Sequence, residues 1–256
     1  METNKNANVL ITGAAHRIGR TIAMDLAAHG FGVAVHYNAS ADGAQEVVQA
    51  ITDEGGRAVA VQAELADEEQ VKRLIPTATK ALGPLTVLVN NASLFENDTV
   101  NDATRESWDK HLDVNLRAPF VLSQMFAEQL PEDQDGNIIN LLDQRVWNLT
   151  PFFMSYTVSK AGLWTLTQTL AMALAPQIRV NAVGPGPTIR NERQSEEDFA
   201  RQLGETPLER RVMPQDIADA VRFIINAPSM TGQMIAMDGG QHLGWGQASN
   251  RLAPNE

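Results

Sequence analysis

The chain of 256 residues is long enough for one large α/β domain, and its 43% of hydrophobic residues is ordinary for a protein that buries a sizeable core. It has no cysteine, which excludes disulfides, thiolate zinc sites and cysteine nucleophiles. The net charge of −11 disfavours nucleic acid as a partner, because phosphate backbones bind to basic surfaces.

The first segment, residues 1–8, is polar and leads directly into a strand. It lacks the apolar core of a signal peptide, and no apolar run in the chain has the length of a membrane span. We therefore expect a cytoplasmic protein that acts on a small-molecule substrate, with no membrane partner and no metal ion.

Apolar strand-like segments alternate with helical segments along the chain. Strands are predicted at residues 7–11, 31–37, 58–62, 85–89, 137–142, 178–182 and 234–237. Helices are predicted at residues 18–29, 41–54, 67–82, 103–129 and 155–174, with a further one beginning near Pro214. This βαβα order predicts a single α/β domain over residues 1–256, with a doubly wound parallel sheet and helices on both faces.

Two segments stand outside this alternation. Residues 190–211, within an excursion at about 187–213, are polar and charged, so we expect a mobile segment rather than a domain boundary, a substrate lid that orders when ligands bind. Residues 241–256 form a tail without clear periodicity. The tail either lines the substrate site of a neighbouring subunit, where Trp245 and Arg251 are its candidate contacts, or is a frayed terminus.

Residues 12–19, TGAAHRIG, join the first strand to the first helix. A glycine-containing turn in this place brings backbone N–H groups and a helix N-terminus up to the pyrophosphate of a dinucleotide. The turn lacks the three-glycine spacing, and Arg17 stands where a glycine is common, so an ordinary tight turn stays an alternative. The turn predicts a Rossmann-like dinucleotide site.

The end of the second strand bears on the choice of cofactor. An NAD-specific site usually has an acidic residue here to bind the ribose 2′-hydroxyl, but residues 36–41 contain no acid. His36, Asn38 and Ser40 can donate hydrogen bonds to a 2′-phosphate, and Arg17 can add positive charge nearby. The sequence therefore favours NADPH over NADH.

Tyr156 and Lys160 open the long helical segment at residues 155–174. Their i, i+4 spacing places them on one face of the helix. A lysine ammonium beside a phenol favours loss of the phenolic proton, so the pair makes a tunable acid. The alternative is a surface tyrosine beside a solvated lysine.

Several motifs in this order resemble the short-chain dehydrogenase/reductase family along nearly the whole chain. They are Thr12-Gly13 with Gly19, Asn90-Asn91-Ala92, Asn115, Tyr156 with Lys160, Pro185-Gly186, and Asp238-Gly239-Gly240. The resemblance implies an oxidoreductase with a Rossmann fold. It also implies that Tyr156 is the catalytic acid, that Lys160 holds the nicotinamide ribose, and that Asn115 supports a water-mediated proton path to Lys160.

One departure from the family pattern is informative. The family usually has a serine about thirteen residues before the tyrosine, and the residue here is Asp143. This replacement is typical of pteridine reductases, which the chain also resembles in residues 13–19, His36-Tyr37 with Ser40, residues 90–95 and residues 183–186. Ala39, Glu64 and the loop at residues 145–148 depart from that subfamily, at positions that bear on the cofactor and substrate contacts.

The resemblance implies site residues one by one. Cofactor contacts are expected at Thr12, Gly13, Arg17, Ile18, Gly19, His36, Tyr37, Asn38, Ser40, Glu64, Leu65, Asn91, Ala92, Ser93, Leu141, Tyr156, Lys160, Pro185, Gly186 and Thr188. Substrate contacts are expected at Arg17, Phe95, Asp143, Trp147 and Tyr156, with the ring of Phe95 stacking on a pterin. Asp143, Tyr156, Lys160 and Asn115 are the expected catalytic residues.

An aspartate at position 143 changes the chemistry that the tyrosine can perform. Its negative charge disfavours the tyrosinate, so Tyr156 stays protonated and is suited to donate a proton. A carboxyl group also binds amino and ring N–H groups, and reduction of a C=N bond needs a proton on nitrogen. The alternative is that Asp143 merely caps the end of a strand.

These observations favour an NADPH-dependent reductase of a dihydropterin or dihydrofolate, with a Tyr-Lys-Asp proton relay. Two alternatives stay open: a carbonyl reductase of the 3-oxoacyl type, and a non-catalytic NADPH-binding protein. Leu163, Leu166, Leu170 and Leu174 make an apolar stripe on the helix that carries Tyr156. In the family such helices pair between subunits, which implies a homotetramer, unless the stripe packs on the protein's own sheet.

Overall fold

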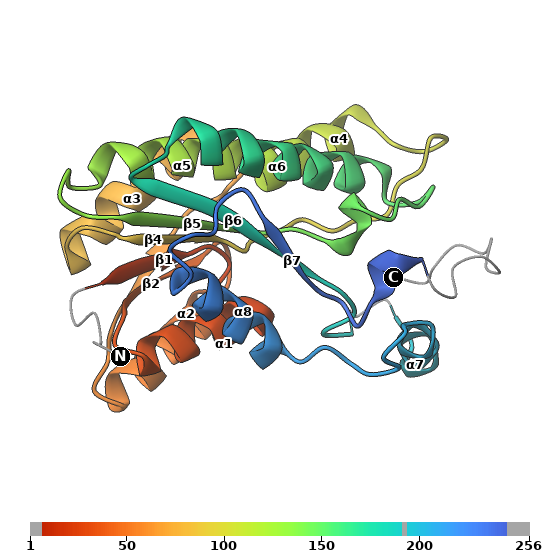
Figure 1. Cartoon of the computed structure of the whole chain (residues 1–256), viewed down its shortest axis with the longest axis horizontal. Helices are drawn as coiled ribbons and strands as arrows, with labels where there is room; N and C mark the ends of the chain where they lie inside the picture. Colours follow the sequence, from red (N-terminus) through yellow and green to blue (C-terminus); the bar gives the residue numbers. More distant parts are fainter. Residues whose placement is uncertain (1–6, 191–193, 245–256) are drawn as a thin grey trace.

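The computed structural model describes residues 7–190 and 194–244, and a parallel sheet runs through its centre (Figure 1). In these residues the sheet has seven strands in the order β3-β2-β1-β4-β5-β6-β7. They are β1 (Asn8–Ile11), β2 (Gly32–Tyr37), β3 (Arg57–Gln62), β4 (Val87–Asn90), β5 (Gly136–Leu141), β6 (Ile178–Pro185) and β7 (Met234–Met237). The strand order reverses between β1 and β4, so the sheet is doubly wound and the predicted Rossmann-like α/β fold is confirmed.

Helices cover both faces of the sheet, as predicted. On one face lie α1 (Arg17–Ala28), α2 (Ala41–Asp53) and α8 (Pro214–Ile225), and on the other α3 (Glu68–Leu82), α5 (Ala118–Gln129) and α6 (Met154–Ala173) (Figure 1). The other helical segments are α4 (Arg105–Leu112), the π-helix η1 (Asp113–Arg117), α7 (Glu196–Gly204), and two short 3₁₀ turns, η2 (Gln144–Val146) and η3 (Gln241–Leu243).

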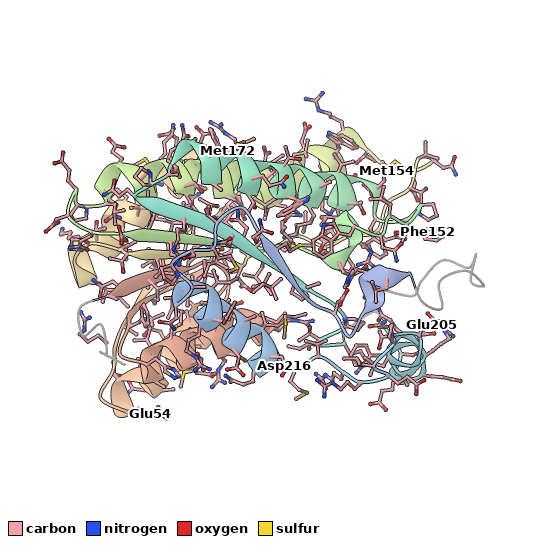
Figure 2. The ribbon with its side chains drawn as sticks, in the orientation of Figure 1. Glu54, Phe152, Met154, Met172, Glu205 and Asp216 are labelled. Carbon is pink, nitrogen blue, oxygen red and sulfur yellow. The ribbon has the colours of Figure 1, made fainter. Side chains whose placement is uncertain are left out.

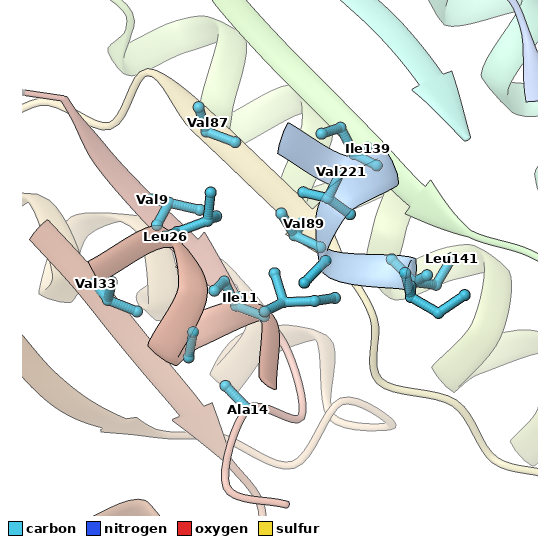
Figure 3. Close-up of a cluster of buried hydrophobic side chains, with 14 of the residues drawn as sticks. Val9, Ile11, Ala14, Leu26, Val33, Val87, Val89, Ile139, Leu141 and Val221 are labelled. Carbon is cyan, nitrogen blue, oxygen red and sulfur yellow. The ribbon is translucent and has the colours of Figure 1, made fainter. Parts of the chain in front are cut away.

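The core is divided by the sheet into two layers. Val9 and Ile11 point to one face, where they join the cluster that contains Leu26 of α1 and Val221 of α8 (Figure 3). Leu10, between them in β1, points to the opposite face and packs in the layer under α3 and α5. Because side chains alternate along a strand and both faces are covered, β1 consists of apolar residues without a polar alternation.

The predicted helix at residues 103–129 is three segments rather than one. α4 ends at Leu112, η1 follows as a turn of π-helix, and α5 begins at Ala118. The π-turn contains Asn115, which is completely buried and bonds to the backbone of Leu94 through both ends of its amide group. These contacts lie outside the helix, so the apolar pattern at residues 103–129 could not indicate the interruption. A single π-turn inside a helix often marks a functional site.

The excursion after β6 contains the helix α7, which the sequence analysis did not predict. Ser195 caps this helix by accepting a hydrogen bond from the N–H of Asp198. Glu196, Glu197 and Asp198 then place negative charge in its first turn, where the helix dipole stabilises it. The order of a capping serine and three acidic residues favours a helix here, although the segment has little apolar periodicity.

The leucine stripe on α6 packs on the protein's own core. Leu163 and Leu170 are buried, and Leu166 and Leu174 pack against the layer on the same face of the sheet. The alternative that the stripe packs on the protein's own sheet therefore holds for Leu163 and Leu170, whereas Leu166 and Leu174 stay partly exposed. The large apolar side chains that α6 exposes are Val158 and Met172. The homotetramer stays a prediction.

No helix within residues 7–190 and 194–244 is long and apolar enough to cross a bilayer.

Candidate active site

A cleft lies at the carboxyl ends of the strands, near the point where the strand order reverses. Figure 2 shows Met154, at the start of α6, at the same end of the molecule as Glu205 beside α7. The lining comes from the β1–α1 turn, the segments at the ends of β4, β5 and β6, the start of α6, the excursion, and η3. It comprises Arg17, Ile18, Asn91, Ser93, Phe95, Leu141, Leu142, Asp143, Arg145, Tyr156, Lys160, Pro185, Gly186, Pro187, Thr188, Ile189, Gln194, Phe199, Gln202 and Gln241. Open α/β sheets bind their ligands in this position.

The β1–α1 turn is locked to the loop after β4. The hydroxyl oxygen of Thr12 accepts hydrogen bonds of 2.9 Å from the N–H groups of both Asn91 and Ala92. The amide of Asn91 donates to the carbonyl of Thr12 at 2.7 Å and to that of Gly13 at 3.2 Å. A Cβ on Gly19 would lie 2.3 Å from the carbonyl oxygen of Gly13, so only glycine allows this close approach.

The N-terminus of α1 faces the cleft and can receive an anion. Within the described part of the chain, His16 makes no side-chain cap and the first turn contains no acidic residue. The first N–H groups of this twelve-residue helix therefore remain available to a phosphate, with the positive end of the helix dipole behind them. This arrangement fits the pyrophosphate of a dinucleotide.

The structure corrects the prediction for His36. Its side chain is buried, Nδ1 accepts a hydrogen bond of 3.0 Å from the N–H of Gly13, and Nε2 lies 3.1 Å from the carbonyl of Ala63. Burial lowers the pKa of the imidazole from 6.5 to about 4, so the ring is neutral at physiological pH. Both nitrogens are engaged inside the protein. His36 therefore stabilises the β1–α1 turn instead of donating to a 2′-phosphate.

The other residues predicted near the 2′-phosphate lie at the ends of β2 and β3. Asn38 is exposed and donates to the carboxylate of Glu64 at 2.6 Å. Ser40 stands at the N-cap of α2, and among the described residues its hydroxyl caps no helix N–H. Tyr37 is half-buried against the core under α1 and α2, and Leu65 packs into the core under α3. Asn38 and Ser40 are therefore the better placed of these residues to meet a phosphate.

Tyr156, Asp143 and Lys160 converge in the cleft. The hydroxyl of Tyr156 donates a 2.8 Å hydrogen bond to Oδ2 of Asp143. The Nζ of Lys160 donates to the carbonyl of Leu141 at 2.8 Å and lies 5.9 Å from the centre of the Tyr156 ring. Burial lowers the pKa of Lys160 from 10.5 to about 8, and the charge of Asp143 partly opposes this shift. A lysine with this pKa is mostly charged at pH 7. Its positive charge favours the ionised form of the neighbouring phenol.

Asn115 lies behind this group, in the π-turn. Its Nδ2 donates to the carbonyl of Leu94 at 2.9 Å and to the hydroxyl of Ser159 at 3.0 Å. Ser159 precedes Lys160 on α6, and its hydroxyl donates to the carbonyl of Tyr156 at 2.6 Å. Asn115 thus ties the loop after β4 to the helix that carries Tyr156 and Lys160.

Phe95 lines the cleft, but one face of its ring is already covered. The ring stacks on Phe153 with a centroid distance of 4.6 Å and an interplanar angle of 2°, and it meets Tyr156 edge-on at 4.7 Å. Phe153 is fully buried and has a φ of +56°, an unfavourable conformation for a bulky residue. Phe95 can offer a substrate ring no more than its second face.

Arg145 lines the cleft and was not among the predicted site residues. Its guanidinium forms an ion pair with Asp143, with Nη1 3.1 Å from Oδ2, and the backbone N–H of Arg145 donates to Oδ1 at 2.8 Å. Asp143 therefore also caps the η2 turn, so the cap interpretation and the Tyr156 contact are both present. The sequence signal was an arginine two residues after an aspartate at the end of a strand.

Trp147 was predicted to contact the substrate, but within the described residues it is absent from the cleft lining. Its ring packs edge-on against Trp164 at 6.3 Å and against His242 at 5.3 Å. The η2 turn directs Arg145 into the cleft and Trp147 toward α6 and η3.

The excursion contacts the opposite wall of the cleft through Arg17. The Nη2 of Arg17 donates to the carbonyl of Ile189 at 2.9 Å. Arg17 has a φ of +53°, in the position where a glycine is common. Gln194, Phe199 and Gln202 of the excursion, and Gln241 of the tail, also line the cleft. Trp245 and Arg251 lie outside the described residues.

A sequence profile described as enoyl-(acyl carrier protein) reductase matches residues 13–242. The crystal structure of a short chain dehydrogenase from Burkholderia cenocepacia in complex with NADP is similar over 93% of this chain and 99% of that one, with 34% identity and a TM-score of 0.88. This chain belongs to the short-chain dehydrogenase/reductase family.

Two further relatives of this dehydrogenase/reductase differ in their reported activity. FolM alternative dihydrofolate reductase 1 from Brucella suis, in complex with NADP, is 50% identical, with a TM-score of 0.92 and coverage of 94% of this chain and 97% of its own. The 3-oxoacyl-[acyl-carrier-protein] reductase FabG from Staphylococcus epidermidis is 35% identical over 93% of this chain and all of its own length.

Proposed function

We propose that this protein is an NADPH-dependent reductase that transfers hydride to a C=N bond of a pterin ring, with a dihydropterin or a dihydrofolate as substrate. The observation that carries the proposal is the hydrogen bond from the Tyr156 hydroxyl to the Asp143 carboxylate. The similarity to FolM, an alternative dihydrofolate reductase, supports the same substrate class.

The cofactor is NADP(H), and the residues of the cleft fit it. The available N–H groups at the start of α1 suit the pyrophosphate, and the polar side chains of Asn38 and Ser40, after β2, would donate to a 2′-phosphate. Lys160 would hold the nicotinamide ribose. NADPH supplies the hydride, so the protein has to supply the proton and the orientation of the substrate.

The protein's own groups divide this work. The carboxylate of Asp143 accepts the hydrogen bond of Tyr156, which keeps the phenol protonated in the resting site. The amino-substituted pyrimidine ring of a pterin has N–H groups, and Asp143 can accept hydrogen bonds from them. The hydroxyl of Tyr156 then turns to the ring nitrogen and delivers its proton there. The charge of Lys160 stabilises the phenolate that remains.

The alternative is a carbonyl reductase of the 3-oxoacyl type, and the 35% identity to FabG favours it. A ketone oxygen gains negative charge during reduction and is stabilised by hydrogen-bond donors. Asp143 offers a carboxylate acceptor where the family usually has a serine hydroxyl, which disfavours this reaction. A non-catalytic NADPH-binding role is disfavoured by the convergence of Tyr156, Asp143 and Lys160.

A panel of substrates tests the proposal. NADPH oxidation is followed with dihydrobiopterin, dihydromonapterin, dihydrofolate, a 3-oxoacyl thioester and small ketones under identical conditions. We expect a dihydropterin or dihydrofolate to have the highest kcat/KM. A higher kcat/KM for the thioester or a ketone would contradict the proposal. Paired titrations should show tighter binding of NADPH than of NADH, and equal affinities would reassign Asn38 and Ser40 as ribose contacts.

Variants of the cleft then test the roles of its residues. Tyr156→Phe and Asp143→Ser should each lower pterin turnover by about 10²–10⁴-fold, the usual contribution of a general acid, with little change in NADPH affinity. Asp133→Ser, at an exposed position, is the matched control. If Asp143→Ser kept pterin turnover within about threefold of the parent enzyme, Asp143 would have no function beyond capping η2.

A further inference from the structure

The ion pair of Arg145 and Asp143 is nearly shielded from solvent at the wall of the cleft. The two side chains are 9% and 13% exposed. Protein donors converge on both oxygens of the carboxylate: the N–H of Arg145 on Oδ1, and Nη1 of Arg145 together with the Tyr156 hydroxyl on Oδ2. Asp143 thus has one well-defined orientation, because a fork of charge-assisted hydrogen bonds fixes its plane.

The guanidinium is itself held by aromatic rings from two separate parts of the chain. Its central carbon lies 5.4 Å from the ring centre of Phe95 and 5.2 Å from that of Phe153, and these rings stack on each other. Contacts of this kind between arginine and aromatic rings are attractive and strengthen when they are desolvated. The loop after β4 and the start of α6 therefore determine where the charge of Arg145 lies.

The η2 turn brings the backbone of Arg145 to the same carboxylate. The N–H of Val146 donates to the carbonyl of Asp143 at 3.2 Å, and the N–H of Trp147 donates to that of Gln144 at 3.0 Å. These bonds close a tight turn directly after β5, so residue 145 returns over the side chain of residue 143. The arginine is matched to the aspartate by backbone geometry as well as by charge.

We propose that Arg145 is a positioning residue that holds the Asp143 carboxylate in register with the Tyr156 hydroxyl and balances its charge. Paired in this way, Asp143 acts as a fixed acceptor for N–H groups of a substrate, and the proton for the reduced nitrogen comes from Tyr156. The consequence for substrate choice rests on the proposed pterin reduction, whereas the coupling of Arg145 to Asp143 does not.

Arg145→Met retains most of the side-chain volume and removes the charge and the donors. We expect it to lower kcat by about 10–100-fold, part of the contribution of a general acid, with NADPH affinity within about threefold of the parent enzyme. Arg145→Lys, which restores a cation, should recover part of the loss. Arg105→Met is the matched control, because it removes an arginine from an exposed ion pair with Asp109 on α4.

A double-mutant cycle separates positioning from a general effect on the fold. In an Asp143→Ser background, Arg145→Met should change kcat by less than about threefold, because the group that it positions is gone. If the fold-losses in kcat of the two single variants multiply in the double variant, the proposal is overturned. A kcat of Arg145→Met equal to that of the parent enzyme would also overturn it. If Arg145→Met does not fold, Arg145→Gln replaces it in the cycle, and equal kcat values for Arg145→Gln and Arg145→Lys would equally overturn it.

The cycle is measured with whichever substrate the panel identifies. If that substrate is a ketone, the proposed pterin reduction fails, and the coupling between positions 143 and 145 is still read directly. If it is a pterin and the losses add, the proposed function stands and the role of Arg145 fails.

Discussion

His36 makes a specific contribution to the pH dependence of stability. In the folded protein its Nδ1 accepts the N–H of Gly13, which assigns the ring proton to Nε2, facing the carbonyl of Ala63. A second proton would have to enter at Nδ1 and would set two N–H groups against each other. Acidification should therefore destabilise the folded protein at the β1–α1 turn, which contains Gly13.

The magnitude follows from the shift in pKa. Burial lowers the pKa of His36 from 6.5 to about 4, and each unit corresponds to about 1.4 kcal/mol, so the difference amounts to about 3 kcal/mol. Between pH 6.5 and 4 the unfolded chain binds a proton that the folded chain does not bind. The stabilising contribution of the neutral His36 is thus complete above pH 6.5 and is lost as the pH falls toward 4.

Urea unfolding at a series of pH values, at one fixed protein concentration, compares the parent protein with His36→Gln. Glutamine can accept from Gly13 and donate to Ala63 without titrating, and the acidic residues titrate equally in both proteins. We expect the free energy of unfolding of the parent to fall by about 2–3 kcal/mol more than that of the variant between pH 7 and 4.5. Parallel pH profiles would refute the assignment of His36 as a buried neutral residue.

Two further predictions follow from the turn and from the surface of α6. Gly19→Ala should weaken NADPH binding by about tenfold or more, because its Cβ would overlap the carbonyl of Gly13, whereas Gly204→Ala, whose Cβ would meet no described atom within 4 Å, should bind normally in the same titration. A homotetramer of 27.9 kDa subunits remains the expected assembly, based on the family and on the exposed Val158 and Met172 of α6; a monomeric mass by light scattering at micromolar protein would contradict it.

Most of the fold could be predicted from local patterns. The alternation of apolar strands with helical segments implied the doubly wound sheet, because covered parallel strands need continuous apolar runs and crossover helices. The i, i+4 spacing likewise placed Tyr156 and Lys160 on one helix face, and both line the cleft. The position of Asp143 in the motif order indicated that it lies close to Tyr156. In the structure a hydrogen bond of 2.8 Å joins the two side chains.

What the sequence by itself determined about this protein is therefore the order of its elements and the residues that end them at one edge of the sheet. The tertiary structure alone decided that Asn115 lies in a π-turn, that His36 is buried and neutral, and that Arg145 rather than Trp147 faces the cleft. Hydrophobic periodicity reports which face of an element is buried, and it is a local property. The partner of a buried polar side chain is set by segments distant in the sequence, such as Ala63 for His36 and Phe95 for Arg145, which no local pattern encodes.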